Sequence, residues 1–187
     1  SNLSNRLRGQ AQLAQQEENN ARHLLELSQQ LSQVQDVKSL VEVVKKNLTE
    51  AYPLDCYVYL HDWEMRRKKL SPGDLTQELP SSLKSGILLA PDELVALEAA
   101  LRLGRPTGAL TDLHSFLTAT FYPVKTPRQV LAVIRLSAFP GKTVRLTEGP
   151  ERNQSSKLHF ESLCNQAALA IEQLESAEQT RQAELSA

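Results

Sequence analysis

The first quarter of the chain consists almost entirely of residues that favour helix. Residues 3–50 contain no proline and one glycine, Gly9, and they are rich in Gln, Glu, Ala and Leu, which have high helix propensity. The polar run 32–36 interrupts this pattern, and Asp36 suits the N-cap of a second, amphipathic helix. At 187 residues the chain is long enough for one ordinary core or for one core plus extended helices.

The first of these two helices carries a heptad pattern. Its apolar members are Leu3, Leu7, Ala14, Ala21, Leu24 and Leu31, and Gln10, Glu17 and Ser28 fill the remaining positions of the same stripe. Such a stripe predicts pairing with a parallel helix in a homodimer. Because some of its positions are polar, the stripe favours a helix pair that can switch between two registers and does not favour a pair that is locked in one.

The middle of the chain changes to short runs of β-forming residues. These runs lie at 56–60, 107–110, 119–124 and 130–136. The segment 125–128 predicts a tight hairpin between the last two. A further short strand is expected within 63–70, followed by a turn at 71–74, and residues 75–89 favour no element.

Two more helices are expected. The first spans 91–101, with Pro91 in its first turn and Gly104 as its stop. The second begins near Leu158 and runs to the end of the chain. Its apolar stripe contains Cys164, Ala167, Ile171 and Leu174.

This order of elements predicts an α+β fold with a central, mainly antiparallel sheet, helices on one side and long N- and C-terminal helices. We expect three parts: an N-terminal signalling helix at 1–35, a globular domain at 36–172, and the start of a C-terminal signalling helix at 173–187.

Composition narrows the partners and the compartment. Lys and Arg number 21 against 22 for Asp and Glu, so no overall positive field favours nucleic acid or an anionic membrane. No run approaches the roughly 20 apolar residues that span a bilayer. Cys56 and Cys164 match no metal or redox spacing, and we expect buried thiols in a reducing compartment.

The residues that could carry chemistry do not combine into a catalytic motif. His23 is followed by Leu24, without the acid and proline of a phosphorylated histidine box, and no glycine-rich nucleotide loop occurs. The four histidines share no metal spacing, and neither cysteine suits attachment of a bilin. The carboxylates of Asp112 and Glu148 stand alone in the sequence. We therefore expect no enzymatic activity, no cofactor and no metal.

Several strings, taken in order, resemble GAF domains of KdpD-type sensor histidine kinases. They are GRPTGALTD at 104–112, TFYPVK at 120–125 with VLAVI at 130–134, and FESLCNQAALAIE at 160–172. The N-terminal strings NLSNRLR at 2–8 and RHLLELS at 22–28 are similar to the cytoplasmic helix that leaves the transmembrane bundle of these kinases.

The resemblance implies a GAF-like fold and a regulatory role. We expect a cytoplasmic domain of a bacterial inner-membrane sensor kinase, without membrane contact of its own. It would relay a potassium or osmotic signal through its flanking helices to the kinase core of the same chain. Two alternatives stay open: a GAF domain that binds a cyclic nucleotide, in a transcription activator or phosphodiesterase, and a dimerisation scaffold without ligand.

If the domain binds a small molecule, the sheet face opposite the signalling helices should line the site, together with the loops over it. The expected lining residues are Tyr57, Tyr59, Thr111, Asp112, His114 and Tyr122. These residues also suit a purely structural role, with the tyrosines half-buried in the sheet, Thr111 and Asp112 in a turn, and His114 in a solvated loop.

Overall fold

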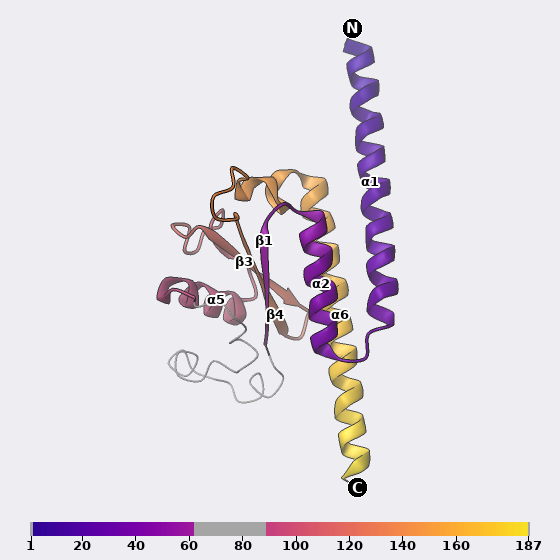
Figure 1. Ribbon diagram of the computed structural model, residues 1–187, viewed down its shortest axis with the longest axis vertical. Helices are drawn as coiled ribbons and strands as arrows, with labels where there is room; N and C mark the ends of the chain where they lie inside the picture. The colour runs from indigo at the N-terminus through magenta and orange to yellow at the C-terminus, as the bar shows by residue number, and fades with distance from the viewer. Residues whose placement is uncertain (1, 62–88, 187) are drawn as a thin grey trace.

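The computed structural model describes residues 2–61 and 89–186. A central sheet has helices on both of its faces (Figure 1). The helices and strands are α1 Asn2–Ser32, α2 Val37–Ala51, β1 Asp55–Leu60, α5 Pro91–Leu103, β2 Thr107–Gly108, β3 Ala119–Lys125, β4 Val130–Ser137 and α6 Gln154–Leu185. Two short 3₁₀ helices, η1 Leu146–Glu148 and η2 Pro150–Arg152, precede α6.

The break between α1 and α2 lies in the predicted polar run. Asp36 has an extended backbone, and its Oδ1 accepts a hydrogen bond of 2.8 Å from the backbone N–H of Ser39. This bond satisfies one of the free N–H groups in the first turn of α2. The predicted N-cap is therefore confirmed.

The sheet is antiparallel throughout, in the order β1-β4-β3-β2. β3 and β4 form the predicted hairpin, in which the N–H of Thr126 donates to the carbonyl of Gln129 over 3.0 Å. β2 is shorter than the predicted strand at 107–110, because the chain turns at Gly108 with φ +95°. A Cβ there would lie 2.2 Å from the carbonyl oxygen of Ala119, so only glycine allows the approach of β3.

Helices α1, α2 and α6 cover one face of the sheet, which we call the helix face (Figure 1). Their buried side chains join those of the sheet in the larger core. Fully buried members include Leu27 of α1, Leu40 of α2, Ile171 of α6 and Ile134 of β4. The amphipathic stripes predicted for α2 and α6 form the contacts with this core.

Helix α5 packs on the opposite face, which we call the α5 face (Figure 1). Its residues Ala96, Leu97 and Ala100 form a smaller core with Tyr59 and Phe121. The predicted fold class is confirmed, with one correction: the helices lie on both faces of the sheet. The short apolar stripe of α5 needs its own surface to bury.

Most predicted boundaries agree with the structure. Gly104 ends α5 in the left-handed conformation with φ +64°. α6 begins earlier than predicted, because Asn153 caps it by accepting from the N–H of Ser156 over 2.8 Å. The strand expected within 63–70 and its turn lie outside the described residues. The three-part division of the chain stays a prediction.

Candidate functional site

The six predicted site residues fall into three separate groups. Tyr57 and Tyr59 lie two apart on β1 and face α5, with ring centroids 6.4 Å apart. Thr111, Asp112 and His114 lie in the turns between β2 and β3. Tyr122 lies on β3 and packs into the core of the helix face.

The α5 face holds a buried polar cluster. Arg135 of β4 donates from Nη2 and Nε to Glu93 Oε1 of α5, over 2.7 and 3.2 Å, and from Nη1 to Ser137 Oγ over 3.0 Å. Both charged side chains are largely buried, with 13% and 14% of their surface exposed. Buried ion pairs with good geometry hold elements in a defined arrangement, so this pair fixes α5 to the sheet.

Tyr59 lies on the same face with a buried hydroxyl. This hydroxyl finds no hydrogen-bond partner among residues 2–61 and 89–186. Burial raises the pKa of Tyr59 to about 12, while the charge of Arg135 acts in the opposite direction. An unpaired buried hydroxyl is costly and can bond to a polar ligand group. The α5 face is therefore our candidate ligand site.

Arg135 and Glu93 were not among the predicted site residues. A positive charge within the apolar run of β4 was a sequence feature that could have indicated Arg135. Glu93 stands in the first turn of α5, where an acidic residue is expected on grounds of the helix dipole alone. Nothing local pointed to their pairing.

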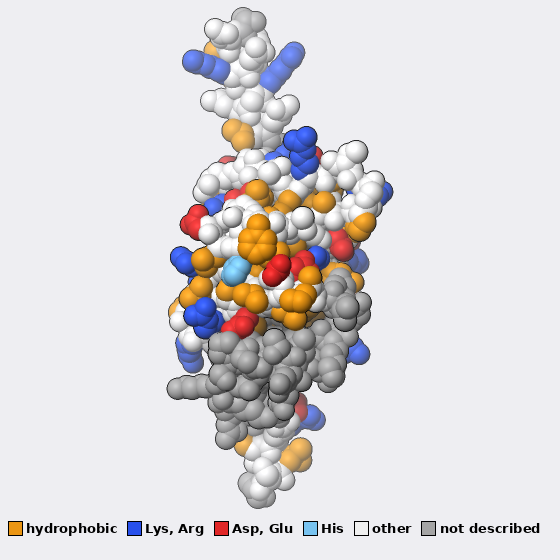
Figure 2. All heavy atoms as spheres, turned by 90° about the vertical axis from the view of Figure 1, so that its left-hand side faces the viewer, with side chains coloured by type: hydrophobic (Ala, Val, Ile, Leu, Met, Phe, Trp, Pro, Cys, Tyr) orange, Lys and Arg blue, Asp and Glu red, His pale blue; other side chains and the backbone are white. Residues whose placement is uncertain are grey.

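The turns after β2 pack against the core of the α5 face through Leu117. The hydroxyl of Thr111 lies 2.7 Å from the carbonyl oxygen of Gly108 and 2.9 Å from that of Leu113, which holds the turn. His114 has φ +60°, and its ring meets Phe116 edge-on at 6.1 Å. Asp112 is exposed. Figure 2 shows this side, where exposed hydrophobic side chains gather beside charged ones.

Tyr122 lies on the helix face, so its predicted place on the opposite face is wrong. Its ring packs edge-on against Phe160 of α6 at 4.8 Å, and its hydroxyl lies 3.4 Å from Glu151 Oε1. Burial raises the pKa of Tyr122 well above its usual value. The binding role of the six residues stays a prediction, but Tyr122 cannot share one cavity with Tyr57 and Tyr59.

Helices α1 and α6 run parallel and contact each other beside the sheet (Figure 1). Asn20 Nδ2 donates to Ser155 Oγ over 3.2 Å, and the rings of His23 and His159 lie 6.2 Å apart. His159 is buried, and its Nδ1 has no partner among the described residues. Burial lowers the pKa of His159, and the neighbouring His23 lowers it further.

A hollow of about 450 Å³ lies beside these histidines, between α1, the end of α2 and the start of α6. Tyr52 lines it and donates from its hydroxyl to the carbonyl of Ser156 over 3.1 Å. The charged residues Glu50, Glu148 and Arg152 also line it. The contact between α1 and α6 is therefore polar at this end and apolar further along, at Leu27.

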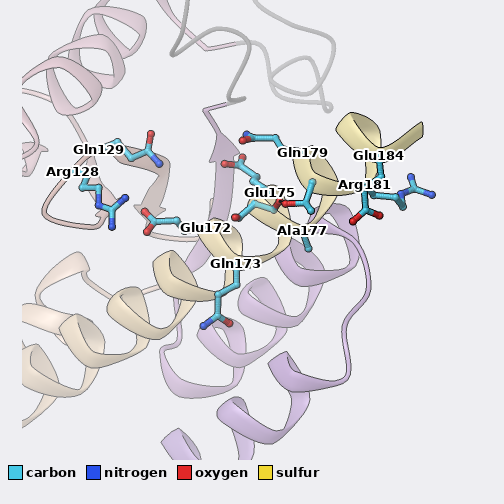
Figure 3. A pocket seen from close by; sticks show the side chains of 11 residues that line it. Arg128, Gln129, Glu172, Gln173, Glu175, Ala177, Gln179, Arg181 and Glu184 are labelled. Atoms are coloured by element: carbon cyan, nitrogen blue, oxygen red, sulfur yellow. The ribbon is translucent and has the colours of Figure 1, made fainter. Parts of the chain in front are cut away.

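A larger, open groove of about 990 Å³ follows the second half of α6 past the β3–β4 hairpin (Figure 3). Its side chains are mostly polar or charged, and they include Arg128, Glu172 and Arg181. Thr126 Oγ1 donates to Glu172 Oε2 over 3.0 Å and so ties the hairpin to α6. This groove belongs to the part of α6 that leaves the sheet.

No nucleophile or metal centre emerges among the described residues. Cys56 and Cys164 are buried free thiols, and burial raises the pKa of Cys56 to about 12, which keeps it protonated. No three His, Cys, Asp or Glu side chains gather where they could hold a metal ion, within residues 2–61 and 89–186. In the same residues, no helix has the length and hydropathy needed to span a membrane.

No protein-family model matches the sequence, and no curated protein matches it. Among solved structures, the chain is similar to the native GAF domain of the potassium sensor histidine kinase KdpD from Escherichia coli. The TM-score is 0.61 at 17% identity, and the match covers 86% of this chain and 98% of that domain. At this identity the likeness establishes the fold alone, and the chain therefore has a GAF-like fold.

Proposed function

We propose that this chain is the cytoplasmic regulatory domain of a membrane-bound sensor histidine kinase. In this proposal it relays a potassium or osmotic signal through α1 and α6 to a kinase core in the same polypeptide. The GAF-like fold supports a regulatory role, and the structural neighbour is itself a domain of a potassium sensor kinase.

The path of the two long helices carries the proposal. α1 approaches from one end of the molecule, packs beside α6, and α6 leaves at the other end (Figure 1). α6 also contacts β3, β4 and α2. A change in the sheet can thus shift α6 relative to α1, and two packing arrangements close in free energy suffice for a switch.

A second copy of the chain is the expected partner of α1. Leu3 and Leu7 of the predicted seam are 69% and 58% exposed, and Ala14 and Ala21 are exposed on the same stripe. Leu24 and Leu31 are instead buried or partly buried against α2 and α6. The outer stripe of α1 is thus available for a parallel homodimer, in which the relay would operate.

The test alters the polar positions of that seam in the full-length kinase. Replacing Gln10, Glu17 and Ser28 together with Leu should lock the dimer in one register, because all three are exposed and lie on the stripe. We expect autophosphorylation that no longer responds to potassium or osmolarity. The measurement is the phosphorylation rate in membranes across a range of both.

A matched variant distinguishes the effect of changing the seam from the effect of adding hydrophobic surface to α1. Gln12, Glu26 and Gln29 are exposed on other faces of α1, and their replacement with Leu should leave the response intact. A response that survives the seam variant, or that is lost equally in both, would contradict the relay.

Nucleotide binding is the competing outcome. A purine cyclic nucleotide that raises the melting temperature of the chain at micromolar concentration would favour the ligand-binding alternative. A tight dimer whose melting no compound changes, together with an unresponsive kinase, would favour the scaffold.

A further inference from the structure

A second groove lies on the helix face, apart from the cluster around Tyr59. It has a volume of about 370 Å³ and separates α6 from residues 104–106, which connect α5 to β2. We call it the connector groove. The lining residues that concern its chemistry are Arg105, Tyr122, Lys125, Phe160, Glu161 and Asn165.

The inner part of the groove is apolar. Tyr122 and Phe160 form its base, with their rings edge-on at 4.8 Å. Pro106, Pro123 and Pro150 add further apolar surface. Pockets of a few hundred Å³ with apolar walls and few polar groups suit small organic ligands. The base of this groove can therefore take an apolar side chain.

Some of the charged groups at its mouth already have partners. Lys157 Nζ lies 4.0 Å from Glu151 Oε2, and the Tyr122 hydroxyl also approaches Glu151. Lys125 Nζ donates to the carbonyl of Gly104. Lys157 and Glu151 thus have partners of opposite charge, and Lys125 has a neutral acceptor.

Two groups of opposite charge remain. Arg105 on the connector and Glu161 on α6 are exposed, and neither has an ion pair or hydrogen bond with a residue in 2–61 or 89–186. A simple anion would pair with Arg105 and leave Glu161 as a repelling charge, and a simple cation would do the reverse. A ligand that carries both charges complements both walls.

We propose that the connector groove binds a small zwitterion with an apolar side chain, that is, an α-amino acid. The carboxylate pairs with Arg105, the ammonium group pairs with Glu161 and Asn165, and the side chain packs on Tyr122 and Phe160. Arg suits this task because its guanidinium binds a carboxylate in a bidentate manner. The site does not depend on the proposed kinase relay.

The probe is L-phenylalanine, titrated into the ¹⁵N-labelled chain. Amide resonances of 104–106 and 157–165 should shift in a saturable manner, with a dissociation constant of about 1 mM or tighter. Phenylpropionate lacks the ammonium group and phenylalaninamide lacks the carboxylate, so both should bind about tenfold more weakly or worse. If either analogue bound as tightly as L-phenylalanine, the proposal of a zwitterionic ligand would be wrong.

Variants test the location. Arg105→Gln and Glu161→Gln alter exposed side chains, so the core stays intact, and each should weaken L-phenylalanine about tenfold. Arg102→Gln and Glu184→Gln alter exposed side chains outside the groove and should leave the binding of L-phenylalanine unchanged. Binding that Arg105→Gln and Glu161→Gln leave unaltered, or no shift at about 10 mM probe, would overturn the site. The titration measures ligand binding to this chain directly. A negative result would therefore leave the relay proposal standing.

Discussion

The two faces of the sheet differ in size and chemistry. The helix face buries a large apolar core that extends from β1, β3 and β4 through α2 and α6 to Leu27 of α1. The α5 face buries a small core and, next to it, the ion pair between Arg135 and Glu93 and the hydroxyl of Tyr59, which has no partner within residues 2–61 and 89–186.

The difference suggests a division of roles. A large apolar core transmits displacement because it is closely packed and resists compression. A small core beside buried polar groups is less stable and can exchange its contacts for those of a ligand. We therefore propose that the core of the helix face transmits the signal and that the α5 face is the more easily rearranged of the two, and four predictions test this comparison.

The largest expected effect compares two leucines, one on each side of the sheet. Leu136 is buried in the core of the helix face and Leu97 in that of the α5 face. We expect Leu136→Ala to lower the free energy of unfolding by about 4 kcal/mol and Leu97→Ala by about 2 to 3 kcal/mol, because the small core can relax around the lost volume. Urea denaturation measures both values. A greater loss for Leu97→Ala would reverse the comparison.

The next effect concerns the buried ion pair. Glu93→Gln removes the negative charge and leaves Arg135 buried with a neutral acceptor, which we expect to cost about 2 to 3 kcal/mol. Asp92→Asn, at an exposed neighbouring position, is the matched control and should change stability little. Chemical denaturation gives the values, and hydrogen exchange of α5 shows whether the loss is local. An unaltered stability would mean that the pair does not hold α5.

Removing either of two tyrosine hydroxyls should change the free energy of unfolding by a smaller amount, with opposite signs for the two. The Tyr59 hydroxyl on the α5 face is unpaired among the described residues, whereas the Tyr52 hydroxyl on the helix side donates to Ser156. Tyr59→Phe should raise the free energy of unfolding by about 1 kcal/mol, and Tyr52→Phe should lower it by about 1 kcal/mol. Thermal and urea unfolding distinguish the signs. Destabilisation by Tyr59→Phe would show that this hydroxyl has a partner.

Local chemistry explains what the sequence predicts well. The cap at Asp36, the stop at Gly104 and the β3–β4 hairpin each depend on residues close together in the chain. Helical and strand periodicity likewise indicate which side chains are buried. The fold class follows from the order of these elements.

The candidate site depends on contacts between residues far apart in the sequence, and no local sequence pattern predicts such contacts. Alternation along β1 places Tyr57 and Tyr59 on one face, but Tyr122 pairs in register with Ile134 and so faces the helices. Arg135 meets Glu93 across 42 residues. The contact of His23 with His159 needs both long helices to be packed.

The smallest expected effect lies at the polar end of the helix face, where α1 meets α6. The pKa of His159 is lowered below its usual 6.5 by burial and then by His23. A histidine with a lowered pKa stabilises the packed state while it is neutral, so this contribution is full above pH 6.5 and falls as the pH drops below that value. Around the hollow, Glu50 and Glu148 favour the protonated ring and Arg152 opposes it.

Acidification from pH 7.5 to about 5 should therefore loosen α1 from α6 without unfolding the core, because His159 is the one buried histidine among residues 2–61 and 89–186. Hydrogen exchange of α1 residues after Gln16, corrected for intrinsic rates, measures the change. His159→Gln should remove most of this pH dependence, and His23→Gln should reduce it, because burial is the larger cause. Loosening that persists in the His159→Gln variant would assign the pH dependence to the carboxylates instead.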